Sequence, residues 1–317
     1  MRSKILRKYD SRRQVFYAIL IYMMEGCDND MHFVDAKGIL SAKNGMNIYR
    51  GCTHGCIYCD SRSKCYQFTH AFEDIEVKQN APQLLEMALR SKRKKCMIGT
   101  GAMCDPYMHC EEQLQLTRRC LEIIDRYGFG LAIQTKSDRV LRDLDLLKSI
   151  NKKAKCVVQM TLTTYDEELC KILEPNVCTT KRRYETLQIL QENGIPTVVW
   201  LSPILPFIND TCENIEGILD YCIKAKVHGI ICFGMGVTLR EGDREYFYAA
   251  LDRYFPGLKG QYHRKYGYSY EVTSDNHNEL MRLLHTRCRE HGIECDMKKV
   301  FSYLNELPER YEQMSLL

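Results

Sequence analysis

Three cysteines near the start of the chain are the side chains best suited to metal chemistry. Cys52, Cys56 and Cys59 follow a C-x3-C-x2-C spacing. Gly51 and Gly55 let the backbone turn tightly enough for the three sulfurs to converge on one soft metal centre. A 4Fe–4S cluster that is held by only three protein ligands keeps one iron open for a small molecule. The spacing therefore predicts a metal centre with a vacant coordination position.

Two other interpretations of these cysteines compete with a cluster. Structural zinc takes four ligands, usually from two separated C-x2-C pairs, and without a second pair Cys65 would have to serve as the fourth ligand. Such a site would leave the polar ends of the predicted strands without a role. Alternatively, the cysteines are ordinary buried residues. The loop that carries them is rich in Gly, Thr, His, Asp, Ser and Arg, however, and offers little apolar surface in which to bury them.

The composition is that of a globular protein. The chain has 317 residues, of which 45% are hydrophobic, enough for one large domain or two small ones. Its net charge of +4, from 45 basic and 41 acidic side chains, is too small to indicate nucleic-acid binding or to exclude it. The 17 cysteines are scattered and odd in number, which fits a reducing cytoplasm better than a disulfide framework.

Residues 1–30 are interpreted as an N-terminal extension, either a short amphipathic helix or a disordered segment. An apolar run from Gln14 to Met24 follows a basic stretch, as in a signal peptide. The run is much shorter than the ~20 residues of a membrane-spanning helix, and no small-residue cleavage site follows it. We therefore expect no membrane association, and Met31 is an equally good natural start.

Short β-like runs alternate with helical patterns from Gly45 onward, which predicts a parallel α/β architecture with its chemistry at the carboxyl ends of the strands. A long amphipathic helix over residues 111–127 is one example of the helical pattern. We expect a barrel-like domain over residues 31–238. A mostly helical C-terminal region without a further clear strand is expected over residues 239–317. The six predicted strands are residues 46–50, 96–100, 129–135, 156–162, 197–201 and 229–233.

A glycine-rich segment ends the second predicted strand. Gly99 and Gly101 would let the backbone approach a ligand closely, and Asp105 adds an acceptor for an ammonium group. Other polar segments end the later strands, among them Gln-Thr-Lys-Ser at residues 134–137 and Met-Thr-Leu-Thr-Thr at residues 160–164. Because the strands are expected to be parallel, these segments should meet at one edge of the sheet.

Together with Tyr58, directly before the last cysteine of the loop, these segments resemble the radical S-adenosylmethionine (radical SAM) superfamily. The Asp-Pro-Tyr at residues 105–107 and the Leu-Thr-Arg at residues 116–118 are similar to its spore photoproduct lyase-like branch. The resemblance implies an open (β/α)6 partial TIM-like barrel. It also implies that a 4Fe–4S cluster reductively cleaves SAM to a 5′-deoxyadenosyl radical, which abstracts hydrogen from a substrate. Such chemistry needs an external reductant of the flavodoxin or ferredoxin type.

The resemblance also implies roles for single residues. The three cysteines of the loop would be the cluster ligands, and the other residues would contact SAM. These are Tyr58 beside the adenine, Gly99, Gly101 and Asp105 at the amino group, Lys136 and Thr161 at the carboxylate or ribose, and Arg182 or Arg183 paired with the carboxylate.

Cys104 has two interpretations. In spore photoproduct lyase a cysteine at about this place donates a hydrogen atom to the product radical, so the resemblance implies a catalytic role for Cys104. The chain uses cysteine freely, however, with Cys96, Cys110 and Cys120 nearby, and packing in the core is the alternative.

The substrate is the part of the function that the sequence determines least. Resemblance to a DNA-lesion lyase implies DNA, and basic residues at 92–95 and 181–183 are compatible with it. The C-terminal region, however, shows neither a clear wedge nor a basic groove. Peptide or small-molecule modification by the same chemistry is an alternative. A non-catalytic metal-binding protein is a second, and a DNA-binding module that shows salt-dependent affinity without SAM cleavage is a third.

Overall fold

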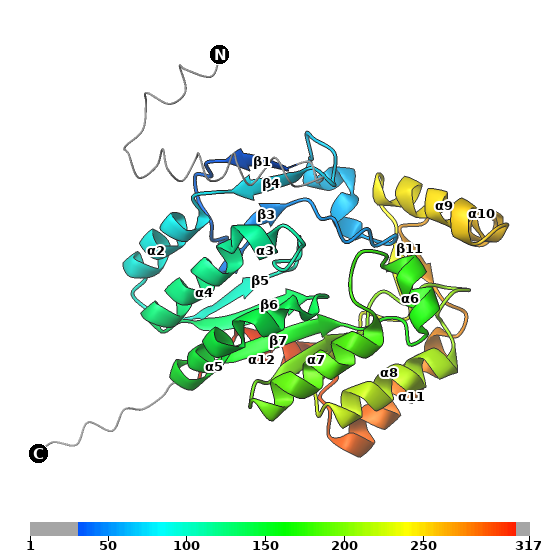
Figure 1. Ribbon diagram of the computed structural model, residues 1–317. Helices are drawn as coiled ribbons and strands as arrows, with labels where there is room; N and C mark the ends of the chain where they lie inside the picture. Colours follow the sequence, from blue (N-terminus) through cyan, green and yellow to red (C-terminus); the bar gives the residue numbers. More distant parts are fainter. Residues whose placement is uncertain (1–30, 309–317) are drawn as a thin grey trace, which may run out of the picture.

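A six-stranded parallel sheet forms the centre of the computed structural model, which describes residues 31–308. Strand order in space follows strand order along the chain, and β2 and β9 lie at the two edges, so the sheet is an open partial barrel (Figure 1). The predicted parallel α/β fold is confirmed. The six strands are β2 (Gly45–Met46), β5 (Met97–Thr100), β6 (Gly130–Thr135), β7 (Cys156–Thr161), β8 (Thr197–Trp200) and β9 (Gly229–Ile231).

Helices cover the outer face of this sheet, because each strand is followed by a crossover that packs back on it (Figure 1). Every residue of β7 is buried, as expected for a parallel strand that is covered on both faces. No helix within residues 31–308 is long and apolar enough to cross a membrane. The outer helices are α2 (Ala81–Ser91), α4 (Leu116–Tyr127), α5 (Leu144–Lys153), α7 (Thr180–Glu192) and α8 (Cys212–Lys224).

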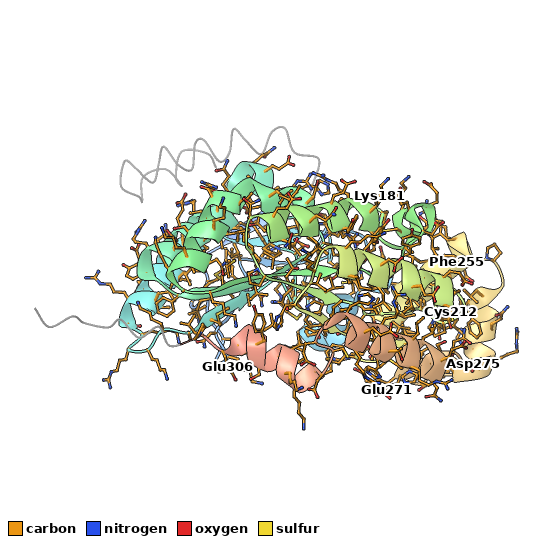
Figure 2. All side chains as sticks on the ribbon, turned by 90° about the horizontal axis from the view of Figure 1, so that it is seen from below. Lys181, Cys212, Phe255, Glu271, Asp275 and Glu306 are labelled. Atoms are coloured by element: carbon orange, nitrogen blue, oxygen red, sulfur yellow. The ribbon has the colours of Figure 1, made fainter. Side chains whose placement is uncertain are left out.

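The inner face of the sheet is partly closed by α12 (Met297–Asn305), the last described helix. Its buried side chains Val300 and Leu304 pack against one residue from each of β5 to β9. Figure 2 shows this helix, drawn in salmon before Glu306, on the side of the sheet away from the green helices. The carboxyl ends of the strands lie beyond it. The strand residues in this inner cluster are Met97, Ala132, Val157, Val198 and Ile231.

The first predicted strand, residues 46–50, is divided between two sheets. Met46 ends β2 in the main sheet, whereas β3 (Tyr49–Arg50) pairs antiparallel with β4 (Ile75–Lys78). β4 also pairs in parallel with β1 (Met31–Val34), which gives a separate three-stranded sheet. The chain leaves the main sheet after two paired residues, so β3 delivers the cysteine loop from this smaller sheet.

The predicted helix over residues 111–127 is also divided. Gln115 adopts a left-handed conformation with φ 49°, which separates α3 (Glu111–Leu114) from α4. At this break the amide of Thr117 donates to the side-chain carboxylate of Glu111 at 3.1 Å. A 3-10 helix, η4 (Asp138–Asp143), leads directly into α5.

The C-terminal region is mostly helical, but the expectation that it contains no strand was wrong. β10 (Gly236–Thr238) and β11 (Glu271–Thr273) form an antiparallel pair, and strands this short leave little periodicity in the sequence. Side chains of this region pack on Ile57 and Tyr58 of the cysteine loop. Its helices are α9 (Asp243–Tyr254), α10 (Leu258–Tyr266), α11 (His277–His291) and α12.

Candidate active site

The cysteine loop is held in place by backbone hydrogen bonds to two distant segments. The amide of Cys52 donates to the carbonyl of Phe72 at 3.0 Å, and that of Ile57 donates to Leu173 at 3.0 Å. Gly51 adopts φ +93°, and a Cβ atom there would lie 2.5 Å from the Phe72 carbonyl oxygen. Only glycine therefore allows the chain to enter the loop along this path.

The loop is also covered from the side of Asn176. The Asn176 amide donates to the His54 carbonyl at 3.2 Å, and its side-chain Nδ2 donates to the Thr53 carbonyl at 2.9 Å. Gly55 adopts φ +69°, and a Cβ atom there would lie 3.1 Å from Cγ of Pro175. The two glycines predicted to shape the loop are thus required by its conformation and by its neighbours.

The three cysteine side chains share a protected environment. Cys56 is buried, and Cys52 and Cys59 are partly buried. Burial raises the pKa of the Cys56 thiol to about 12 despite the opposing charge of Lys136. The pKa of Cys52 is well above its ordinary value through burial and through the charges of Cys59 and Cys56. These thiols would become thiolates when metal displaces their protons.

The three cysteines are not drawn together as a compact metal site without their metal. Within residues 31–308, the group of three possible ligands whose atoms all lie within 4.8 Å of one another is His32, His70 and Asp74.

A buried ion pair supports the aromatic residue of the loop. Glu174 accepts a hydrogen bond from the Tyr58 hydroxyl and lies 2.5 Å from Nη2 of Arg183. Arg183 also donates from Nη1 to the carbonyl of Thr161 at 3.0 Å. Burial opposes the charge of Lys136, but the neighbouring Cys56 and Glu174 charges outweigh it and raise the lysine pKa. Lys136 therefore stays cationic beside the loop.

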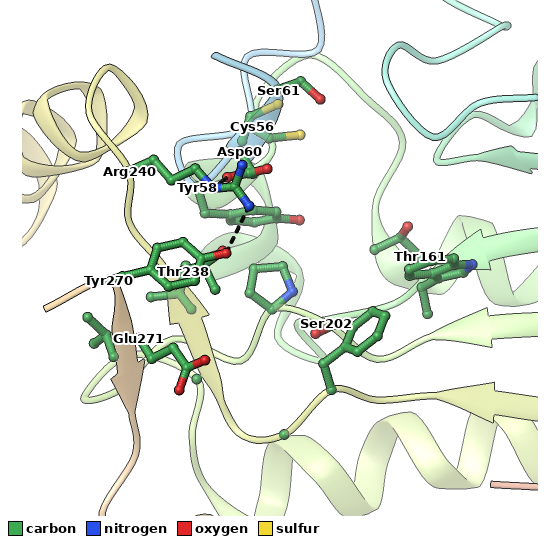
Figure 3. A pocket seen from close by; sticks show the side chains of 18 of the residues that line it. Cys56, Tyr58, Asp60, Ser61, Thr161, Ser202, Thr238, Arg240, Tyr270 and Glu271 are labelled. Atoms are coloured by element: carbon green, nitrogen blue, oxygen red, sulfur yellow. Dashed lines mark hydrogen bonds and ion pairs between the residues drawn. The ribbon is translucent and has the colours of Figure 1, made fainter. Parts of the chain in front are cut away.

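A cavity of about 750 Å³ opens between the cysteine loop, the strand ends and the C-terminal region. Figure 3 shows Cys56 and Tyr58 at one end of it and Thr161 and Ser202 on the opposite side. Of the residues predicted from sequence, the structure brings Cys56, Tyr58, Cys59, Lys136 and Thr161 to this cavity. Its position at the carboxyl ends of the strands is the one expected for an α/β barrel.

Asp105, which is predicted to contact the SAM amino group, is not among the residues that line the cavity. Its Oδ1 accepts from the Tyr107 amide at 2.8 Å and from the Thr135 hydroxyl at 2.7 Å. Its Oδ2 accepts from the Lys136 amide at 2.7 Å. The carboxylate is thus engaged in holding the second and third strand ends together.

The two predicted glycines do not line the cavity either. Gly101 has φ +99°, and a Cβ atom there would lie 1.9 Å from the carbonyl oxygen of Gln134, so close packing of β5 on β6 requires it. Nothing lies within 4 Å of a Cβ atom built on Gly99. The neighbouring Ala102 and Met103 line the cavity instead.

Cys104 and Arg182 are also placed away from the cavity lining. The Cys104 thiol is buried in the main core and donates to the carbonyl of Tyr49 at 2.8 Å, which corresponds to the packing alternative. Arg182 is partly exposed and pairs with Asp138 and Glu185. Arg183 is completely buried, is not part of the cavity lining, and donates to the backbone carbonyl of the lining residue Thr161.

Several residues of the cavity lining were not predicted from sequence. Arg240 donates from Nη2 to the hydroxyl of Tyr270 at 2.9 Å (Figure 3) and lies 3.4 Å from Oδ1 of Asp60, which directly follows Cys59. Trp200, the only tryptophan, ends β8 in the wall, and Phe233 follows β9 with 67% of its surface exposed. A lone tryptophan at a strand end was the one available signal. Further lining residues are Tyr66, Glu271 and His277.

A sequence model of the radical SAM superfamily matches residues 46–222, more than half of the chain. The chain belongs to the radical SAM superfamily. A 4Fe–4S cluster and SAM are accordingly its cofactors, and the residues present fit both. Cys52, Cys56 and Cys59 offer three soft ligands with a free position beside them, and the cavity adjoining Cys56 and Cys59 has room for a nucleoside-sized molecule.

Relatives of this radical SAM protein occur in distant organisms. An uncharacterized protein of Methanocaldococcus jannaschii is 36% identical over 179 residues, which are 56% of this chain and 66% of that protein. An uncharacterized protein of Mycobacterium tuberculosis is 27% identical over 253 residues, 76% of this chain and 72% of the relative. The first match spans just under two thirds of its relative.

Solved structures of spore photoproduct lyase share the fold. The enzyme in complex with dinucleoside spore photoproduct has a TM-score of 0.58 at 12% identity, over 84% of this chain and 80% of that chain. A variant with bound SAM and the same dinucleoside has a TM-score of 0.57 at 12% identity, with equal coverage. At this identity the likeness concerns the fold alone.

Proposed function

We propose that this radical SAM enzyme abstracts hydrogen from a substrate that carries a nucleobase, with a DNA lesion as the first candidate. The observation that carries the proposal is the continuity of one cavity from the cluster cysteines Cys56 and Cys59 to an aromatic opening formed by Trp200 and Phe233. The centroids of the two rings lie 5.9 Å apart, and Phe233 is 67% exposed. Exposed aromatic rings are the side chains on which unpaired bases stack.

The ligand of a structurally similar enzyme supports a substrate that carries a nucleobase. Spore photoproduct lyase has been solved with dinucleoside spore photoproduct, a ligand built from two linked nucleosides. A lesion in duplex DNA would have to leave the base stack to reach a cavity of this depth. Arg240 lines the same cavity beside Tyr270 and pairs with Asp60 at 3.4 Å, and its partly exposed guanidinium supplies a cation for a phosphate group.

Each part of the site has a proposed task. When bound, the reduced cluster and SAM supply a 5′-deoxyadenosyl radical, and the protein supplies position and exclusion of water. Glu174 accepts a hydrogen bond from the Tyr58 hydroxyl and so fixes the Tyr58 ring in the cavity wall. Lys136, kept cationic by Cys56 and Glu174, balances negative charge at the thiolates or the SAM carboxylate. Thr161 lines the wall at the end of β7.

A second candidate function has its own observation. Glu271 also lines the cavity, and its exposed carboxylate would repel phosphate and attract a cationic group. This charge favours a basic peptide or an amine-containing small molecule as the substrate of the same radical chemistry. We further propose a flavodoxin- or ferredoxin-type reductant as partner. The cytoplasm is the proposed compartment because the chain is cysteine-rich and its cysteine count is odd.

The experiment begins with anaerobic reconstitution of the cluster, followed by dithionite, SAM and measurement of 5′-deoxyadenosine. The variant with Cys52, Cys56 and Cys59 changed to alanine serves as control and should form none. Ultraviolet-irradiated thymidine dinucleotides and a lysine-rich peptide are then added separately. Stimulation of 5′-deoxyadenosine formation by the dinucleotide alone would support the nucleobase proposal, whereas stimulation by the peptide alone would replace it with the second candidate.

A further inference from the structure

Three side chains outside the cavity gather on the small N-terminal sheet. His32 lies on β1, Asp74 directly precedes β4, and His70 lies on the loop before it. Their ligand atoms all lie within 4.8 Å of one another. His32 Nδ1 is 2.8 Å from Asp74 Oδ1, and His70 Nδ1 is 3.9 Å from Asp74 Oδ2. Two imidazoles and a carboxylate at this spacing are a donor set that divalent zinc prefers.

The sheet explains why these side chains meet. His32 is paired in register with Glu76 on the parallel neighbour β4, so both side chains project from the same face. Asp74 stands two residues before Glu76 and therefore projects from that face as well. The opposite face carries the buried side chains of Ile75 and Val77 toward the core. The polar face thus presents three donors from two strands.

His70 completes the group of three side chains. Its ring meets the ring of His32 edge to face, with centroids 4.8 Å apart. Its Nδ1 lies 2.9 Å from the Ala71 carbonyl and donates to it, which leaves the lone pair on Nε2. That Nε2 atom is buried without a hydrogen-bond partner and lies 3.9 Å from Oε2 of Glu76. A buried lone pair that faces a carboxylate is unfavourable unless a cation stands near both.

We propose that His32, His70 and Asp74 bind one zinc ion, with Glu76 as the fourth ligand. The hydrogen bond from His70 Nδ1 to a backbone carbonyl is the arrangement that orients a metal-bound imidazole. The side chains are 40%, 13% and 27% exposed, so an ion can reach them from solvent. The site shares no residue with the cysteine loop and takes no part in the radical chemistry.

The ion would connect the loop over residues 68–74 to β1. The same loop contains Phe72, whose carbonyl accepts the hydrogen bond from the Cys52 amide at 3.0 Å. Phe72 is therefore placed between the proposed ion and the first cluster ligand. Zinc bound to His70 and Asp74 would hold both flanks of Phe72, and so would restrict the backbone that positions Cys52.

Zinc binding is tested on the cluster-loaded protein, because the cluster then occupies the cysteine loop. The protein is treated with EDTA, given Zn²⁺ alone and assayed for zinc per chain by mass spectrometry, with affinity measured against a chromophoric chelator. One zinc per chain is expected. His32→Asn, His70→Gln and Asp74→Asn should each weaken binding at least tenfold, whereas His285→Gln, an exposed histidine on α11, should not change it.

A second measurement protects the test against misfolded variants. Excess Zn²⁺ should raise the melting temperature of the EDTA-treated parent protein and of His285→Gln but not that of His70→Gln. Circular dichroism confirms that the variants are folded. No zinc on the parent protein, or equal zinc affinity in His70→Gln and His285→Gln, would overturn the proposal. Neither result depends on SAM cleavage, so the outcome is separate from that of the proposed function.

Discussion

Glu174 and Arg183 form a completely buried ion pair, with Oε2 of the glutamate 2.5 Å from Nη2 of the arginine. Glu174 also accepts from the Tyr58 hydroxyl, so the pair connects α7 to the cysteine loop. Removing one partner leaves a buried charge without compensation. This ion pair therefore links the stability of the barrel to the position of the cysteine loop.

The first prediction concerns this pair. Arg183→Met should lower the free energy of unfolding by about 3–5 kcal/mol, because the Glu174 carboxylate loses its buried partner. Arg182→Met, at the neighbouring and partly exposed position, should change it by less than about 1 kcal/mol. Urea unfolding of both variants measures the difference. Equal losses would show that the ion pair does not have this role.

The second prediction concerns the cluster ligands. Cys52→Ala, Cys56→Ala and Cys59→Ala should each lose most of the iron and sulfide that the parent protein takes up on anaerobic reconstitution. Cys65→Ala is the matched control, because Cys65 is exposed close to the loop and would be the fourth ligand of a zinc site. Full iron content in that variant, measured chemically, is expected. Its loss would instead revive a four-cysteine site.

The third prediction concerns pH. Burial raises the pKa of Cys56 to about 12, so at pH 8 only about 10⁻⁴ of the molecules carry its thiolate, the form that iodoacetamide attacks. In the cluster-free protein, alkylation of Cys56 should be at least tenfold slower than that of exposed Cys65 and should accelerate as the pH rises toward 12. Mass spectrometry of peptides gives both rates. Fast labelling of Cys56 at pH 8 would contradict the burial of its sulfur.

The fourth prediction concerns Cys104. Because its thiol donates to the Tyr49 carbonyl inside the core, Cys104→Ala should destabilise the fold by about 1–2 kcal/mol. The yield of 5′-deoxyadenosine per folded enzyme and the substrate-derived product should stay the same. Thermal unfolding and product analysis test the two halves. A diverted product in a stably folded variant would restore the catalytic role that the family resemblance implies.

The fifth prediction concerns the aromatic opening. Phe233→Ala should weaken the binding of an irradiated thymidine dinucleotide by about 1–3 kcal/mol if a base stacks on the ring. Tyr268→Ala removes a ring that is even more exposed, at 84% against 67%, but lies outside the cavity lining, and it should leave affinity unchanged. Equilibrium binding to the cluster-loaded protein gives both values. Unchanged affinity in Phe233→Ala would favour a substrate without a base.

The parts that sequence predicted are those encoded over a few neighbouring residues. The spacing of Cys52, Cys56 and Cys59, and the apolar run of β7, are local patterns that need no knowledge of distant segments. The meeting of the polar strand ends could also be predicted, because parallel strands place their carboxyl ends at one edge of the sheet. Lys136 and Thr161 were accordingly brought to the cavity.

The parts that sequence missed depend on contacts between distant segments. A carboxylate such as Asp105 looks the same in sequence whether its oxygens face a ligand or accept from the Lys136 amide. Arg182 and Arg183 are neighbours, yet successive side chains of a helix point about 100° apart. Only Arg183 therefore faces the core. Arg240 and Tyr270 meet only because two three-residue strands pair between them.

The position of α12 has a consequence for how the protein is synthesised. Val300 and Leu304 complete an apolar cluster whose first residue along the chain is Met97. The strands are synthesised early, whereas the helix that covers them is synthesised near the end. Until that helix emerges, apolar side chains on the inner face of the sheet remain exposed to solvent in the nascent chain. A fragment restricted to residues 46–222 would keep that exposure permanently. Expression of this fragment alone should therefore yield aggregates. Chaperone binding to the full-length chain should be strongest before α12 packs on the sheet.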